Sequence, residues 1–246
     1  MDMDERSREI LSVVAHDLRN PLQIIQGYVG MLLELDLDAD GRRQCLERIL
    51  KVSRWTEGVV GDLVDAEAVS QGKLTLRRGT VELDDLLSEV VGSFCFEARE
   101  RGVTLELAPI PGPFRIEADC DRLRQVFHNL LSNALRHASG GRGRVRIGLA
   151  VGDDGVVIGI HDDGAGIAAA ELEAIFGRWS QGDRHSEVGH LGLGLFIAQR
   201  IIDAHHGRLW AESEGPGRGA TFWVCLPVRP GEAHPPPVAA LVPAWQ

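Results

Sequence analysis

A single apolar stripe dominates the first 35 residues of the chain. Between Ile10 and Leu35 the apolar residues recur in alternating steps of four and three, which places them along one side of a helix. The members of the stripe are Leu11, Val14, Leu18, Pro21, Ile25, Tyr28, Leu32 and Leu35. This spacing is typical of a helix that packs against other helices. We therefore predict one long helix, which the turn-forming residues of "DLDADG" bring to an end.

A second stripe of the same kind follows the turn. Its members are Leu46, Ile49, Thr56, Val59 and Leu63. Residues 1–72 are thus predicted to form an antiparallel helical hairpin. Two helices alone leave part of each apolar stripe exposed to water. We therefore expect a homodimer in which two hairpins form a four-helix bundle.

The remainder of the chain alternates between strand and helix patterns. Residues 73–82 are predicted to be a linker with room for a short strand, and residues 83–228 a second domain. Helical periodicity covers residues 84–101, 122–138 and 193–207, and strand-like runs cover 103–108, 144–151, 156–162, 208–213 and 220–227. Grouped strands with interspersed helices indicate an α+β fold with helices on one face of a sheet. The proline-rich residues 229–246 are predicted to be a disordered tail.

Composition narrows the class of function. The chain has 36 acidic and 26 basic residues, a balance that argues against binding a nucleic-acid backbone. Its four cysteines are scattered without a CxxC pair, so we expect neither disulfides nor a zinc site. No apolar run approaches the ~20 residues of a membrane span, and the start is too charged for a signal peptide. These features predict a cytoplasmic protein with no span in this chain.

The first helix carries a reactive combination in "AHDLRNP", residues 15–21. His16 lies off the apolar stripe, and Asp17 beside it can fix the imidazole tautomer or accept its proton. Pro21 lacks an N–H, so the helix can bend just past the histidine. A neutral ring nitrogen held this way can act as a nucleophile. The simpler alternative is a solvated histidine on a helix surface.

A second polar cluster lies on the helix predicted around residue 130. Asn129, Asn133, Arg136 and His137 are spaced so that they share one face. Amide oxygens one turn apart, with a guanidinium one turn further on, can hold Mg2+ and phosphate oxygens. An ordinary polar helix face is the alternative.

Two glycine motifs complete the set. Asp162, Gly164, Gly166 and Ile167 follow a strand in "HDDGAGI", where a carboxylate can accept a hydrogen bond from a ligand amine. Gly192, Leu193, Gly194 and Leu195 open a helix whose free N–H groups suit phosphate. Taken singly, hairpin turns and plain glycine flexibility explain both motifs. The polar stretch between them, residues 176–190, has the composition of a flexible cover or of a surface loop.

In this order the motifs resemble the sensor histidine kinases of two-component signalling. "HDLRNPL", an asparagine-containing helix, DxGxG and GLGLG together span about residues 10–227. The resemblance implies a dimerisation and histidine-phosphotransfer hairpin followed by an ATP-binding α/β sandwich of the Bergerat type. It also implies ATP and Mg2+ as cofactors, and an activity that phosphorylates the chain on a histidine. The recipient of that phosphoryl group would be an aspartate of a response-regulator receiver domain.

The resemblance assigns a role to each motif. His16 is the expected phospho-accepting nucleophile, Asp17 the adjacent acid, and Asn20 the residue that places a water for dephosphorylating the regulator. The expected nucleotide-site residues, carried over position by position, are Asn129, Asn133, Arg136, His137, Asp162, Gly164, Gly166, Ile167, Phe176, Gly192, Leu193, Gly194, Leu195 and Thr221. Among these, Asn133 and Asn129 are the expected magnesium ligands, Asp162 reads the adenine amino group, and Thr221 lies near the adenine.

Three departures from the family pattern keep alternatives open. His190 stands where a glycine is common, and Arg136 replaces a lysine with a planar fork. Only fifteen residues precede His16, so we expect the input from a preceding sensor segment or a separate partner. The alternatives are a dimeric phosphotransfer scaffold with weak or no kinase activity, a regulator phosphatase, and a Bergerat-type ATPase of the chaperone or DNA-repair kind.

Overall fold

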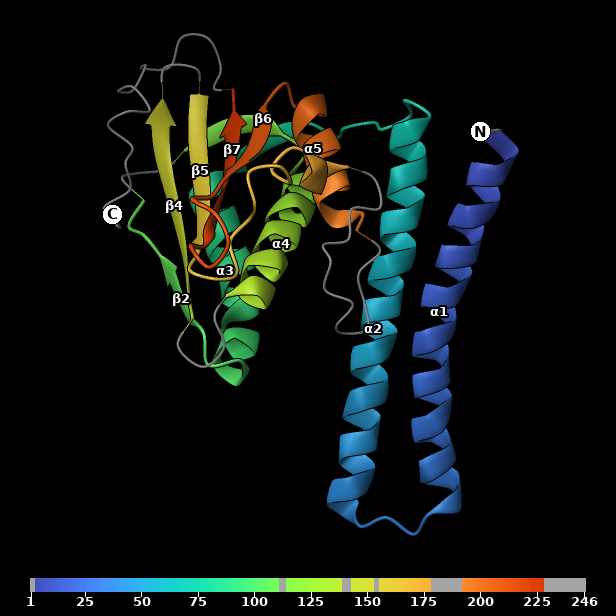
Figure 1. The fold of residues 1–246 in the computed structure, drawn as a ribbon. Coiled ribbons are helices and arrows are strands. Elements are labelled where there is room, and N and C mark those ends of the chain that lie inside the picture. The colour runs from blue at the N-terminus through green and yellow to red at the C-terminus, as the bar shows by residue number, and fades with distance from the viewer. Residues whose placement is uncertain (1–2, 111–113, 139–142, 153–154, 178–191, 228–246) are drawn as a thin grey trace. The chain divides into compact units, whose positions relative to one another are not determined.

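The computed structural model describes residues 3–110, 114–138, 143–152, 155–177 and 192–227 (Figure 1). The side chains of residues 3–17 fall outside this description, as do those of Trp55, Asp62, Ser70, Val151 and Gly152. The chain divides into two compact units, the first containing the hairpin up to Glu67 and the second beginning at Ala68. The proline-rich tail and most of the stretch proposed as a cover, including His190, lie outside the described residues.

Two long helices form the predicted hairpin. Helix α1 spans Met3–Glu34 and continues through Pro21, and helix α2 spans Ala39–Ser70. The turn between them ends at Asp38, whose carboxylate accepts a hydrogen bond from the Gly41 amide at 2.7 Å and so caps α2. Pro21 is buried within the hairpin. The kink expected at Pro21 stays a prediction.

The second unit contains two sheets. Strands β1, Gly79–Glu82, and β3, Arg115–Ala118, form an antiparallel pair. The larger sheet comprises β2, Thr104–Leu107; β4, Arg144–Gly152; β5, Gly155–Asp162; β6, Arg208–Glu212; and β7, Ala220–Leu226. Its order is β2-β4-β5-β7-β6, with β2 and β4 parallel and the other neighbours antiparallel. Strand β5 is therefore the central strand.

Three helices cover one face of this sheet (Figure 1). They are α3, Leu83–Glu100; α4, Cys120–His137; and α5, Gly194–Ala204. A short 3-10 turn, η1, spans Ala174–Phe176. The core lies between the helices and the sheet, where residues 155–160 of β5 are buried without interruption. The predicted α+β fold, with helices on one face of a sheet, is confirmed.

Candidate active site

Asp162 ends the central strand inside the second unit. Its side chain is only 2% exposed, and its Oδ1 accepts a hydrogen bond from the Gly164 amide at 3.0 Å. Burial raises the pKa of this carboxyl from 3.8 to about 7, an effect that the Gly164 hydrogen bond opposes and the charge of Asp163 reinforces. Carboxyls with strongly raised pKa values are concentrated at functional sites, so Asp162 is a candidate functional group.

The glycines after Asp162 are required by their neighbours. A side chain at Gly164 would collide with the carbonyl oxygen of His137, the last residue of α4. Gly166 adopts a φ of 66°, and a side chain there would collide with the carbonyl of Gly215. The Ala165 amide also donates to the His137 carbonyl at 3.1 Å. The loop is thus wedged between the end of α4 and the turn around Gly215.

Helix α4 supplies the asparagines of the candidate site. Asp119 caps the helix by accepting a hydrogen bond from the Arg122 amide at 3.1 Å. One turn apart on the same helix lie Asn129 and Asn133, both half-buried. Arg136 and His137 lie in the last turn, where positive charge suits the helix dipole. The helix predicted to carry these four residues is therefore present, with Asp119 as its N-cap.

Asn129 connects α4 to the start of α5. Its Nδ2 donates to the Gly194 carbonyl at 3.2 Å, so its Oδ1 is the end left to accept. Gly192 has a φ of 65°, Leu193 is buried, and Leu195 is half-buried in the first turn of the helix. Asn129 is therefore brought beside the glycine at the helix start. An amide oxygen presented there fits the ligand that Mg2+ prefers, so the residues are compatible with the expected metal.

Not every predicted residue joins this group. Thr221 pairs with His161 across β5 and β7, and its hydroxyl lies 3.0 Å from the His161 ring. Because neighbouring residues of a strand face opposite sides, Thr221 lies on the sheet face away from Asp162. Phe176 is 8% exposed and packs edge-on against Phe222 at 6.4 Å, as a core residue would.

The hairpin residues are placed only in part. His16 and Asp17 lie within α1, but their side chains are outside the described residues. Asn20, one turn on, is half-buried. Their chemical roles stay predictions.

Sequence reasoning missed the turn that supports the DxGxG loop. Ser213 accepts a hydrogen bond from the Ile167 amide at 3.0 Å and donates to the Gly219 carbonyl at 2.6 Å. Gly215, Gly217 and Gly219 all have positive φ angles. The alternating glycines of "GPGRG", residues 215–219, do predict a turn. The sequence does not show that this turn packs against the DxGxG loop, because that contact joins distant parts of the chain.

Comparisons with known proteins agree with this geometry. Residues 6–72 match the family described as His Kinase A (phospho-acceptor) domain, and residues 118–230 match the Histidine kinase-, DNA gyrase B-, and HSP90-like ATPase family. The sensor histidine kinase CpxA of Escherichia coli K12 is 31% identical over 223 residues, covering 90% of this chain and 47% of CpxA. ZraS of Salmonella typhimurium is 34% identical over 216 residues, covering 87% and 44%.

Solved structures show the same fold. The Acinetobacter baumannii histidine kinase AdeS superposes with a TM-score of 0.64 at 23% identity, covering 87% of this chain and 98% of the AdeS chain. Full-length ShkA in complex with AMPPNP gives a TM-score of 0.64 at 26% identity, covering 91% and 47%. The two family models and these relatives together support the catalytic core of a two-component histidine kinase. The resemblance predicted from the motifs is thereby confirmed.

The chain spans about half the length of the curated relatives it matches. Within the described residues, none of the helices is both long and apolar enough to cross a bilayer.

Proposed function

We propose that the chain phosphorylates itself on His16 with ATP and then passes the phosphoryl group to an aspartate of a response-regulator receiver domain. The observation that carries the nucleotide half of this proposal is the buried Asp162 carboxylate over a loop whose glycines cannot be replaced. The hairpin half is supported by the phospho-acceptor family match over residues 6–72.

Asp162 is suited to reading adenine. When ionised it offers only acceptors, and the exocyclic amine of adenine offers donors. Burial makes the charged form of Asp162 unfavourable while the carboxylate lacks a hydrogen bond from a ligand. A ligand whose N–H donates to the carboxylate would reduce this cost. Gly164 allows the loop to pack against the end of α4 directly beside Asp162, because a side chain there would collide with the His137 carbonyl.

In this proposal, α4 and the start of α5 bind the phosphate end of the nucleotide. Gly194 opens α5, so the first amides of that helix are free to bind anionic oxygens. Asn129 and Asn133 would hold Mg2+ through their amide oxygens, and the metal would neutralise phosphate charge when bound. Arg136 adds a guanidinium from the last turn of α4.

His16 acts as the nucleophile in this proposal. Its neutral ring nitrogen forms a bond to the γ-phosphorus while the bond to the bridging oxygen breaks, and the electron pair leaves with ADP. Asp17 holds or accepts the proton of the other ring nitrogen, so charge does not build up on the imidazole. Asn20 lies one helical turn from His16, where it can orient a water for hydrolysis of the phosphorylated regulator.

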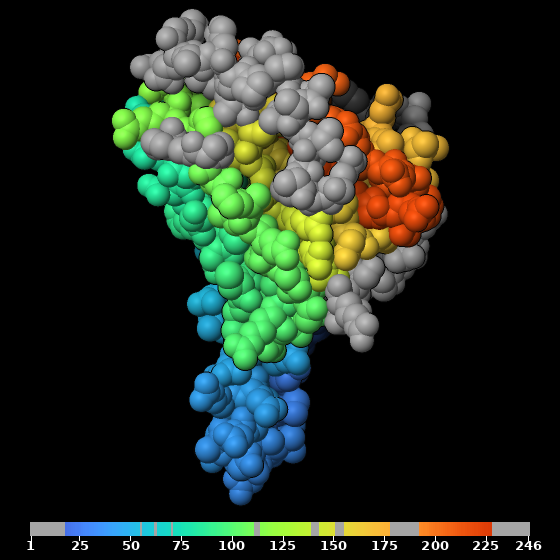
Figure 2. Space-filling model, turned by 90° about the vertical axis from the view of Figure 1, so that its left-hand side faces the viewer, coloured from blue at the N-terminus to red at the C-terminus, as the bar shows by residue number. Residues whose placement is uncertain are grey.

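The hairpin surface supports a homodimer. Leu22, Leu33, Leu46 and Val64 are each more than half exposed in the single chain. Figure 2 shows the loop end of the hairpin as a narrow column. A second hairpin packed on this surface would bury these side chains and complete a four-helix bundle.

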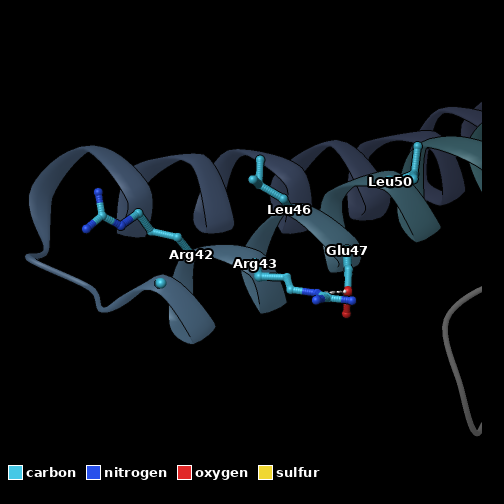
Figure 3. A pocket seen from close by; sticks show the side chains of 6 residues that line it. Arg42, Arg43, Leu46, Glu47 and Leu50 are labelled. Carbon is cyan, nitrogen blue, oxygen red and sulfur yellow. Dashed lines mark hydrogen bonds and ion pairs between the residues drawn. The ribbon is translucent and has the colours of Figure 1, made fainter.

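A shallow hollow at the start of α2 marks part of this surface. It is lined by Ala39, Arg42, Arg43, Leu46, Glu47 and Leu50 (Figure 3). Leu46 and Leu50 point to the same side of α2, while Arg43 and Glu47 form an ion pair at 2.8 Å beside them. An apolar strip bordered by charge is typical of a helix–helix interface.

The deciding experiment is a time course with γ-labelled ATP and Mg2+. Wild type, His16→Gln and the control His206→Gln, which changes an exposed histidine of the second unit, would be compared. We expect label that is stable in alkali, lost in acid, present in the control and absent from His16→Gln. Nucleotide binding without label would instead favour the scaffold alternative. Loss of label from a phosphorylated receiver domain, added separately, would measure the phosphatase activity.

A further inference from the structure

A buried polar junction joins the start of α4 to the end of α5. Asp119 is 6% exposed and His205 is 4% exposed. The Asp119 amide donates to His205 Nε2 at 2.9 Å, and His205 Nδ1 lies 2.8 Å from the Ile201 carbonyl. Because an amide can only donate and a carbonyl can only accept, Nε2 accepts and Nδ1 carries the proton. His205 is therefore neutral and fixed in one tautomer.

The charges around His205 agree with a neutral ring. Burial is the main cause that lowers its pKa, and the Arg78 and His206 side chains act in the same direction. The Ile201 carbonyl and the Asp119 carboxylate oppose this shift without reversing it. The neutral ring of His205 therefore links the Asp119 amide to the Ile201 carbonyl through two hydrogen bonds.

The same junction holds the segment that leads out of the hairpin. Asp119 Oδ2 accepts a hydrogen bond from the Arg77 amide at 2.7 Å, while its Oδ1 caps α4. The Arg78 guanidinium donates to the Ala204 carbonyl at 3.0 Å. Residues 77–78 follow the end of α2 by only a few positions. The linker is therefore bonded both to the start of α4 and to the end of α5.

The two helices are bonded at a second point. At the other end of α5, Asn129 Nδ2 donates to the Gly194 carbonyl at 3.2 Å. From Asp119 to Asn129, and from Gly194 to His205, each helix rises about 15 Å. The segments run antiparallel, because the start of one meets the end of the other. Two fixed links on two rigid helices define how far apart the helices lie at both ends.

We propose that Asp119 and His205 are positioning residues for the nucleotide reaction, and that linker residues 77–78 influence the site through them. Neither side chain touches the nucleotide in this scheme. The junction holds α4 and α5 at the separation at which Asn129 and the helix start at Gly194 face the same phosphates. A displacement of the linker pulls on the junction and changes that separation. This inference rests on the proposed function, since it assigns a purpose to the spacing of the ATP site.

Four variants of the full chain test the inference. His205→Leu fills the space but loses both hydrogen bonds, whereas His205→Gln restores an acceptor for the Asp119 amide. Arg78→Ala releases the linker from α5 and removes no group of the Asp119–His205 hydrogen bond. Arg101→Ala, which removes an exposed ion pair with Glu97 at the end of α3, is the control. The readouts are the Kd of a fluorescent ATP analogue, the melting temperature, and amide hydrogen exchange of residues 194–198.

We expect His205→Leu to weaken ATP-analogue binding about tenfold and to accelerate exchange at the start of α5. His205→Gln should recover most of both effects, and Arg78→Ala should produce a smaller change in the same direction with an unchanged melting temperature. The inference is overturned if exchange changes only around residues 203–207, or if His205→Gln is no better than His205→Leu. If wild type fails to bind the analogue, the proposed function falls, and the exchange comparison still decides whether the junction positions α5.

Discussion

Replacing Asp162 by asparagine should stabilise the protein in alkaline solution while removing the proposed contact with adenine. The wild-type carboxyl is 2% exposed, and burial raises its pKa from 3.8 to about 7. Asparagine has nearly the same shape and keeps an oxygen that can accept the Gly164 amide. The substitution therefore removes the cost of a buried negative charge and little else.

The sign of the effect follows from proton binding. Because the folded protein holds the Asp162 proton more tightly than the unfolded chain, wild type loses stability as the pH rises from 3.8 to about 7. The loss is complete above that range and absent below it. Over the whole range it amounts to about 4 kcal/mol. The stability difference between Asp162→Asn and wild type should grow by this order between pH 4 and pH 8.

Urea unfolding at several pH values measures this difference directly. Subtracting wild type from Asp162→Asn cancels the titration of other groups, including His128 and His161, whose pKa values burial lowers. The matched control is Asp203→Asn, which alters an exposed carboxylate on α5 that pairs with Arg200 at 3.5 Å. A pH-independent difference would refute the reasoning, because it would mean that water reaches Asp162 in the free protein. ATP-analogue binding should be lost in Asp162→Asn at every pH.

Three further substitutions test other parts of the structure. Gly164→Ala places a methyl group against the His137 carbonyl, so it should destabilise the protein by about 2 kcal/mol in urea unfolding and abolish ATP-analogue binding. His206→Gly should add about 0.5–1 kcal/mol of stability without changing binding, since His206 holds a φ of 60° at the end of α5. Replacing Leu46 and Leu50 by glutamate should convert dimers to monomers in light scattering while the ATP analogue still binds. A monomeric wild type, an unstabilised His206→Gly or a fully bound Gly164→Ala would contradict the respective argument.

The regular elements were predictable because their patterns are long. The 3.6-residue period of α4 extends over 18 residues, and residues 155–160 of β5 form an uninterrupted apolar run, which is enough to fix the type of each element. The short strand β3 was missed, because four residues carry little periodicity and its existence depends on pairing with β1. Leu46, predicted on a buried stripe, is 58% exposed in the single chain, as expected of a seam that needs a second hairpin.

The candidate site could be proposed from the sequence as a list of residues but not as a geometry. Asp162 and the glycines could be found from their positions after a strand and before a helix. Which face Thr221 occupies depends on the register between β5 and β7, and sequence patterns do not give register. The link between Asp119 and His205 joins residues far apart in the chain, and neither residue belongs to a recognisable motif.

The position of Asp162 at the end of the central strand has a consequence for the proposed nucleotide site. Strand β5 is hydrogen-bonded on both sides, to β4 and to β7, so exposing it would break both ladders. The opposite end of the proposed site rests on a short helix that begins at a glycine and on single side-chain bonds. The base end of the proposed site would therefore be held by the sheet itself, while the phosphate end depends on the position of one helix start. In the proposed scheme, a shift of α5 would alter the phosphate contacts and leave the proposed adenine contact at Asp162 in place.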